Sequence, residues 1–177
     1  MSQDVILSQM RTQAQIAIDG ADVIIMVTDV RSGVVATDEE VAIMLKKSGR
    51  PVILAVNKCD NVGDVPPEFY EFYNLGLGDP IAVSSVHGHG TGDLLDRVME
   101  LVPQEQEEED DGEEIKVAII GKPNVGKSSL VNKISGQQRC IVSNIAGTTR
   151  DAIDTAVENQ HGKFILIDTA GLRRQSK

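Results

Sequence analysis

Uninterrupted runs of aliphatic residues are the feature that most constrains the fold of this 177-residue chain. Val23 to Val27 and Val52 to Val56 contain no polar side chain, so strands built from them must be buried on both faces. Segments with helical patterning, such as residues 3–18 and 92–101, alternate with these runs. The alternation predicts an α/β fold with a six-stranded, mostly parallel sheet and helices on both faces. The expected strands are residues 23–27, 52–56, 80–83, 115–120, 152–158 and 163–167.

Local signals predict the remaining elements. Thr37-Asp38-Glu39-Glu40 has capping-box spacing, which predicts a helix that starts there and ends before Gly49. Pro66-Pro67 predicts the start of a short helix. Residues 128–135 are expected to form another helix, and the polar residues 137–151 are expected to form a loop.

Composition limits the class of protein. Aromatic residues make up only 3% of the chain, so aliphatic side chains must fill the core. No apolar run approaches the roughly 18 residues of a membrane helix, and no signal-peptide pattern follows Met1. Cys59 and Cys140 give no disulfide or metal-site spacing. We therefore expect a reduced, cytoplasmic protein with no membrane partner.

Negative charge is concentrated in residues 104–114, which contain eight carboxylates. Without them the net charge of −10 would be −2. A block of like charge repels itself and is typical of a solvated linker. The linker divides the chain into residues 1–103 and residues 115–177, and a metal or a basic partner is a less favoured role for it. Because the chain has no basic patch, we expect no direct contact with nucleic acid.

A glycine loop lies between the expected strand 115–120 and the helix after it. It has the sequence Gly121-Lys122-Pro123-Asn124-Val125-Gly126-Lys127-Ser128 and is followed by Ser129. Glycines let successive backbone N–H groups turn toward phosphate oxygens, and the helix N-terminus adds its positive end. Lys127 would reach the β- and γ-phosphates of a nucleotide, and the Ser128 hydroxyl would bind Mg²⁺. A strand–helix turn without a ligand is the alternative, which this spacing disfavours.

Two further segments carry candidate metal and phosphate ligands. Asp168-Thr169-Ala170-Gly171, followed by Leu172, ends the last strand. The Asp168 carboxylate would lie near Mg²⁺, and the Gly171 N–H would bind the γ-phosphate. In Gly147-Thr148-Thr149-Arg150-Asp151, the Thr149 hydroxyl would complete the Mg²⁺ shell. Taken alone, the first segment is more simply a strand-end turn, and the threonines are equally well explained by a cap or turn.

Asn57-Lys58-Cys59-Asp60, which follows a buried strand, has the pattern of a guanine reader. A carboxylate at Asp60 can accept hydrogen bonds from N1–H and the 2-amino group of guanine. Adenine lacks this donor pair and would leave the carboxylate unpaired, at a cost of roughly 1–3 kcal/mol or more. The Lys58 stem would cover the base, and Cys59 is expected to pack. A backbone N–H in Ser84-Ser85 would contact the guanine O6 atom.

His87 and His89 flank Gly88 after this serine pair. A metal-binding histidine pair is conceivable, but no third ligand follows at a fitting spacing, so a solvated loop is the favoured interpretation.

The phosphate loop, Ala146-Gly147-Thr148-Thr149-Arg150-Asp151 and Asp168-Thr169-Ala170-Gly171-Leu172-Arg173 together resemble the second G domain of the Der/EngA tandem GTPases. Residues 1–102 resemble the later part of the first G domain of that family, and the acidic block resembles its interdomain linker. The resemblance implies binding of GTP and GDP, hydrolysis of GTP with Mg²⁺, and a role in assembling the large ribosomal subunit.

The resemblance also implies how hydrolysis would occur. Leu172 stands where Ras-like proteins keep a water-positioning glutamine, and Asn124 matches an asparagine that helps to hold K⁺ in related potassium-stimulated GTPases. Catalysis would then depend on positioning by Lys127, Thr149 and Gly171, together with Mg²⁺ and K⁺. The family's KH-like domain has no counterpart in this sequence, so the large-subunit precursor is a partner implied by the family alone.

The base reader precedes the phosphate loop in this chain, which reverses the order found in most GTPases. One period of a tandem protein contains every element of one G domain, so we expect residues 1–103 and 115–177 to assemble as one circularly permuted G domain. The linker would span about 20 Å as a coil, which is sufficient.

Three hypotheses follow from this arrangement. The first is a GTPase with one composite site. The second is a module that holds GDP and hydrolyses little GTP, because the chain ends fall in the switch loop after Gly171 and Leu172 replaces a glutamine. The third is a swapped dimer, whose halves pair between chains. We expect nucleotide binding to persist and turnover to be weaker than in an unpermuted G domain.

Overall fold

The structure is a computed structural model that describes residues 2–61, 63–102, 114–137, 139–141, 153–159 and 162–169. The linker residues 104–113 and most of the predicted loop 137–151 lie outside the described residues. In the part of the chain that is described, no helix is long and apolar enough to cross a membrane.

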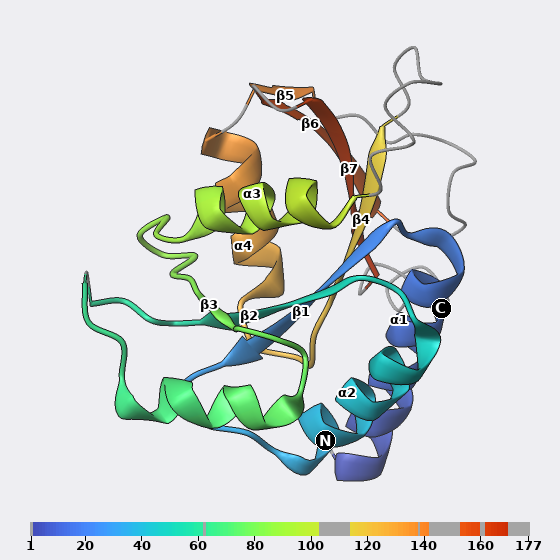
Figure 1. The fold of residues 1–177 in the computed structure, drawn as a ribbon, viewed down its shortest axis with the longest axis vertical. Helices are drawn as coiled ribbons and strands as arrows, with labels where there is room; N and C mark the ends of the chain where they lie inside the picture. Colours follow the sequence, from blue (N-terminus) through green and yellow to red (C-terminus); the bar gives the residue numbers. More distant parts are fainter. Residues whose placement is uncertain are drawn as a thin grey trace.

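One sheet contains strands from both sides of the linker (Figure 1). Its order is β3-β2-β1-β4-β7-β6-β5, and the strands from β3 to β7 are parallel, whereas β6 and β5 run antiparallel to their neighbours. The mostly parallel sheet predicted from the aliphatic runs is therefore confirmed. The strands are β1 (Val23–Asp29), β2 (Val52–Asn57), β3 (Ile81–Ala82), β4 (Ile115–Ile120), β5 (Arg139–Ile141), β6 (Ile153–Asn159) and β7 (Gly162–Asp168).

The sheet differs from the prediction at its two edges. β5 is a seventh strand inside the segment that we expected to be a loop, and it pairs with β6 from Arg139 to Ile141. A three-residue strand of this kind depends on its partner and leaves no periodic signal in the sequence. β3 contains two residues, although the Val83 N–H still donates to the Val56 carbonyl at 2.9 Å. The predicted strand 80–83 is therefore shorter than expected.

The helices lie close to their predicted positions. They are α1 (Gln3–Gly20), α2 (Ala36–Ser48), the 3₁₀ helix η1 (Pro67–Leu75), α3 (Thr91–Leu101) and α4 (Lys127–Gln137). α2 begins one residue before the predicted capping box, because the Asp38 carboxylate accepts the Val35 N–H at 3.2 Å. Gly49 ends this helix with a φ of 77°, a left-handed conformation that glycine adopts without steric cost.

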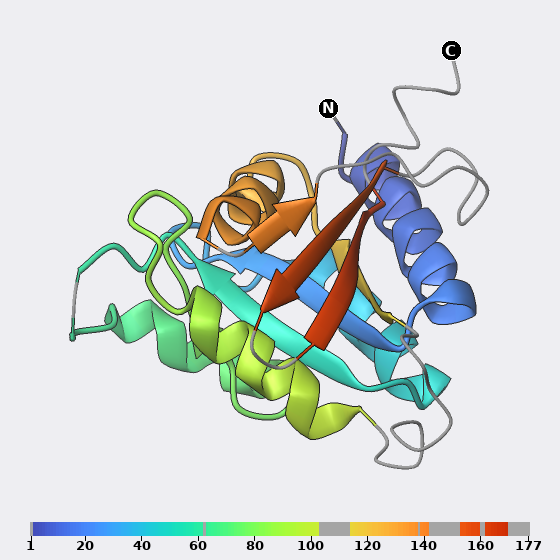
Figure 2. The same cartoon turned by 90° about the horizontal axis from the view of Figure 1, so that it is seen from above.

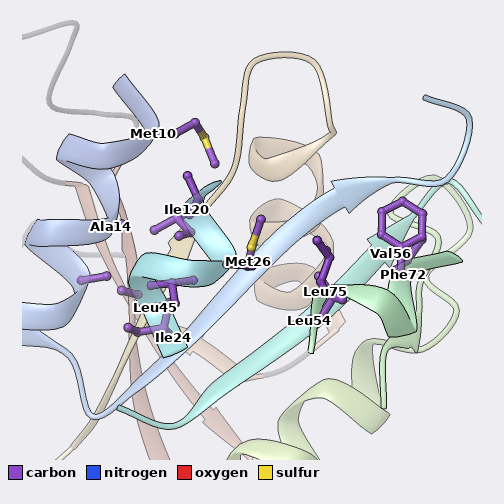
Figure 3. Close-up of a cluster of buried hydrophobic side chains, with 14 of the residues drawn as sticks. Met10, Ala14, Ile24, Met26, Leu45, Leu54, Val56, Phe72, Leu75 and Ile120 are labelled. Carbon is purple, nitrogen blue, oxygen red and sulfur yellow. The ribbon is translucent and has the colours of Figure 1, made fainter. Parts of the chain in front are cut away.

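Each strand of the central sheet packs on two separate cores, because successive side chains point to opposite faces. Ile24 and Met26 face the core under α1, α2 and η1, shown in Figure 3. Ile25 and Val27 face the core under α3 and α4. Figure 2 shows α1 and α4 on opposite sides of the β6–β7 pair. Helices therefore cover both faces of the sheet, as predicted.

β4 lies between β1 and β7, and this position joins the two segments of the chain. The Asp22 N–H donates to the Lys116 carbonyl at 2.8 Å, and the Lys116 N–H donates to the Asp22 carboxylate at 2.9 Å. From there Val23 to Met26 run in register with Val117 to Ile120. The carboxyl ends of β4 and β2 consequently open onto the same edge of the sheet, where parallel sheets bind ligands.

Candidate nucleotide-binding site

Asn57 ends β2 and is fully buried, with 0% of its surface exposed. Its amide nitrogen donates to the Val125 carbonyl at 2.7 Å and to the Ser85 hydroxyl at 3.2 Å. Its amide oxygen accepts the Ser85 N–H at 3.0 Å. One side chain thus connects the predicted base-reading loop, the glycine loop and the loop after β3.

Lys58 makes a second connection between the same loops. It has a φ of 70°, and its ammonium group donates to the Asp29 carboxylate and to the Asn124 carbonyl, both at 2.9 Å. Burial raises the pKa of Asp29, but the hydrogen bond from Lys58 and backbone N–H groups outweigh burial and lower the pKa overall. Asp29 therefore remains ionised and holds the Lys58 ammonium group.

The Asp60 carboxylate is held on both oxygens. It accepts the Ser84 hydroxyl at 2.6 Å and the Arg31 guanidinium at 3.0 Å. Arg31 was not singled out by the sequence, because an exposed arginine 29 residues away carries no local signal. Cys59 is buried, and burial raises the pKa of its thiol to about 11. The thiol therefore stays neutral and packs in the core, as expected from the sequence.

The glycine loop connects β4 to α4 in a tight turn. Gly126 has a φ of 93°, and a Cβ atom added there would collide with the Asn57 amide nitrogen. Asn124 also has positive φ, at 70°, and this residue is exposed. Lys122 and Pro123 are partly exposed, whereas Val125 is buried. α4 begins at Lys127, so that Ser128 and Ser129 lie exposed in its first turn.

The Lys127 ammonium lies inside this loop, and only 7% of the residue is exposed. It donates to the Gly121 carbonyl at 2.6 Å and to the Gln13 side-chain oxygen at 3.0 Å. Burial lowers the pKa of Lys127 to about 8, against the opposing charge of Asp168. The site therefore contains a desolvated cation next to the N-terminus of a helix, an arrangement that favours an anionic ligand.

Gln13 on α1 is a residue of this site that sequence reasoning missed. It is 6% exposed, among the buried residues Met10, Ala14 and Ala17 of the same helix face. A glutamine on an otherwise apolar face was the available signal, because a buried amide needs partners.

Two of the predicted metal ligands, Ser128 and Asp168, are among the described residues. Asp168 ends β7 and pairs in register with Ile119, which precedes the glycine loop, and its charge acts on Lys127. The Thr169 hydroxyl donates to the Ile119 carbonyl at 3.0 Å and approaches Gln13 at 3.2 Å. Oxygen donors at Ser128 and Asp168 fit the preference of Mg²⁺ for hard ligands. The predicted site residues that lie outside the described residues are Thr149, Ala170, Gly171 and Leu172.

His87 and His89 stack with ring centroids 5.5 Å apart. The described residues contain no group of three or more His, Cys, Asp or Glu side chains placed to hold a metal.

A glycine loop between a parallel strand and a helix, beside a buried Asn-Lys-x-Asp loop, defines a P-loop domain of the GTP-binding class. Residues 116–177 match the family described as 50S ribosome-binding GTPase, and residues 10–104 match the Elongation factor Tu GTP binding domain. The chain is 61% identical to GTPase Der of Acetivibrio thermocellus and 60% identical to that of Ruminiclostridium cellulolyticum. Each match covers 99% of this chain and 40% of the relative. The chain belongs to the GTPase Der family, and it spans 40% of the length of these relatives.

The fold is also similar to that of a solved protein. The crystal structure of YjeQ from Thermotoga maritima matches with a TM-score of 0.52 and 19% identity, over 84% of this chain and 47% of that one. At this identity the likeness concerns the fold alone.

The close approach of Gly126 to Asn57 predicts how a single added methyl group changes the stability of the protein. Gly126→Ala should lower the free energy of unfolding by about 1–3 kcal/mol, because alanine is strained at positive φ and displaces the Asn57 amide. Urea denaturation measures the change. Gly136→Ala is the matched control, since an added Cβ meets nothing within 4 Å in α4 and should leave stability unchanged or higher. Equal stability of the two variants would contradict this account of the loop.

Proposed function

We propose that this chain binds GTP and GDP in one composite site and hydrolyses GTP to GDP and phosphate with Mg²⁺. The observation that carries the proposal is the 2.7 Å hydrogen bond from Asn57 to Val125, which joins the base-reading and phosphate loops within one chain. We further propose that the halves form a circularly permuted, monomeric G domain that acts on the large ribosomal subunit. The description of the matching family as 50S ribosome-binding supports the partner.

Guanine binding would depend on Asp60. Its carboxylate already accepts the Ser84 hydroxyl and the Arg31 guanidinium, so it is oriented before the base arrives. N1–H and the 2-amino group of guanine would be its partners in the complex. The Ser85 N–H donates to the Asn57 amide oxygen next to the same place, and it would contact the guanine O6 atom by sharing this hydrogen bond.

Phosphate binding would depend on the loop from Gly121 to Ser128. The backbone N–H groups of the loop and the first turn of α4 would surround the phosphates, and Lys127 would carry the neutralising charge. Mg²⁺, when bound, would neutralise charge on the phosphate oxygens. Ser128 and Asp168 would hold it, and we assign Thr149 and Gly171 to the metal and the γ-phosphate, respectively.

Hydrolysis in this chain would rely on positioning and charge, because Leu172 has no group that orients water. We propose that the Asn124 carboxamide helps to hold K⁺ beside the phosphates. The exposed position of Asn124 in the loop and its side-chain oxygen fit this role.

Base specificity is tested by Asp60→Asn. Asparagine cannot accept both guanine donors, so the affinity for GDP should fall roughly tenfold to a hundredfold. The affinity for xanthosine diphosphate should rise, because the 2-carbonyl of its base can accept a hydrogen bond from the new amide. Fluorescent nucleotide titration measures each constant, and solution mass on the same sample separates a monomer from a swapped dimer.

Asp64→Asn provides the matched control, because it removes an equal charge from an exposed position four residues away. It should leave both affinities unchanged. If Asp60→Asn left the affinity for GDP unchanged, this result would contradict one site shared by the base-reading and phosphate loops.

The lowered pKa of Lys127 predicts a pH dependence. With a pKa of about 8 in the free protein, the ammonium is charged below pH 8 and neutral above it. Because phosphate binds the charged form, GDP affinity should be constant up to about pH 7.5 and then weaken by up to tenfold per unit. Titrations from pH 7.0 to 9.0 measure this. Subtracting the profile of Lys127→Met removes the titration of the ligand and of other groups, and identical profiles would count against the assignment.

Turnover in K⁺ and in Na⁺ tests the monovalent-ion role. GTP hydrolysis should be faster in K⁺, and Asn124→Gly should abolish the difference while GDP still binds, because glycine tolerates the φ of 70°. Phosphate release at equal ionic strength gives the rates. Equal rates in the two salts would contradict the K⁺ assignment, and GDP binding without turnover in either salt would favour the GDP-holding module.

A further inference from the structure

Two hydrogen-bond donors of the phosphate loop converge on one oxygen of Gln13, and a hydroxyl lies beside them. The Gly121 N–H is 3.1 Å from this oxygen and the Lys127 ammonium 3.0 Å, and the Thr169 hydroxyl approaches it at 3.2 Å. All four residues are buried. Gln13 comes from α1, more than one hundred residues before its partners in the chain.

These donors are of the kind that bind a phosphate oxygen. A backbone N–H of the glycine loop and the loop lysine are the groups that cradle phosphates in such sites. In this structure they are satisfied by a neutral amide oxygen instead. Gln13 therefore occupies the position of an acceptor that a bound anion would otherwise supply.

The number of N–H donors on Lys127 determines when the Gln13 oxygen must give up its hydrogen bond to this group. An ammonium group has three N–H donors. One reaches the Gly121 carbonyl and one reaches Gln13, so one remains for a phosphate oxygen. The lysine of such a loop reaches the β- and γ-phosphates. It therefore gives one donor to a diphosphate and two donors to a triphosphate.

We propose that Gln13 is a positioning residue that holds Lys127 in the diphosphate-ready arrangement and lowers the affinity of the site for a triphosphate. The inference rests on the proposed function. A third phosphate must displace the Gln13 oxygen, and it then replaces that oxygen as acceptor for Lys127.

Displacement of Gln13 also makes the contacts of α1 depend on whether a third phosphate is bound. The neighbours of Gln13 on this helix, Met10 and Ala14, pack in the core on the α1 side of the sheet (Figure 3). Removing the amide from the loop takes away the contact that ties this face of α1 to Gly121 and Thr169. The attachment of α1 to the phosphate loop therefore differs between the diphosphate and the triphosphate complex.

Two substitutions at position 13 should act in opposite directions. Gln13→Met keeps the length and helix propensity of the side chain but removes the strong acceptor. It should raise the affinity for the non-hydrolysable triphosphate GppNHp relative to GDP by about threefold to tenfold. Gln13→Glu places a carboxylate on Lys127 and should lower the same ratio by about tenfold or more, because charged hydrogen bonds are stronger.

The measurement is the affinity for GppNHp relative to GDP, given by the dissociation constant of GDP divided by that of GppNHp, with Mg²⁺ present, for the full chain. Gln15→Met is the matched control, since Gln15 lies on the exposed side of α1 and donates to Asp19 at 2.8 Å. It should leave the ratio unchanged. Melting curves establish that each variant is folded before it is titrated.

The outcomes separate the two proposals. If wild type binds neither nucleotide, the proposed function fails. If wild type and Gln13→Met bind GDP alike but the ratio does not rise, or if Gln13→Met and Gln13→Glu shift it in the same direction, the role of Gln13 is overturned. Opposite shifts support the role, because loss of a merely structural contact would weaken both nucleotides together.

Discussion

The hydrogen bonds of the Asn57 side chain are the interaction on which the site depends. A fully buried amide must use its donors and acceptor within the protein, since leaving them unpaired costs about 1–3 kcal/mol. Its partners are the Val125 carbonyl and both the N–H and hydroxyl of Ser85, so three loops take their positions from one side chain. Gly126 follows from the same constraint, because a Cβ there would displace the amide.

The sheet brings these loops together before any of the polar contacts form. β4 inserts between β1 and β7, so a strand from one side of the linker lies among strands from both sides. Parallel pairing then directs the ends of β2 and β4 to one edge, and helices on the two faces exclude water from the aliphatic strands. Lys127 is desolvated as a consequence, and burial moves its pKa to about 8. The electrostatic character of the loop is therefore a product of packing.

Sequence patterns predicted those elements whose signals are local. The aliphatic runs of β1 and β2 are buried strands, because five consecutive apolar residues give a strand two apolar faces. β5 could not be predicted, because its three residues become a strand through pairing with β6. The hydrogen bonds from Arg31 to Asp60 and from Lys127 to Gln13 were missed for a related reason. A single arginine or glutamine has no spacing, and its partner lies 29 or 114 residues away.

The sequence by itself determined the α/β class, the glycine loop and the Asn-Lys-x-Asp loop, because glycine spacing and apolar periodicity act within a few residues. Tertiary structure decided which side chains complete these loops. Asp29 holds Lys58, Ser84 and Arg31 hold Asp60, and Gln13 enters the phosphate loop from α1. These contacts form between segments that meet only when the sheet is assembled. The aliphatic runs thus determine which segments can form one sheet, and the two loop motifs, in their reversed order, lie at the ends of these segments. Pairing of β4 with β1 and β7 decides which polar groups face one another.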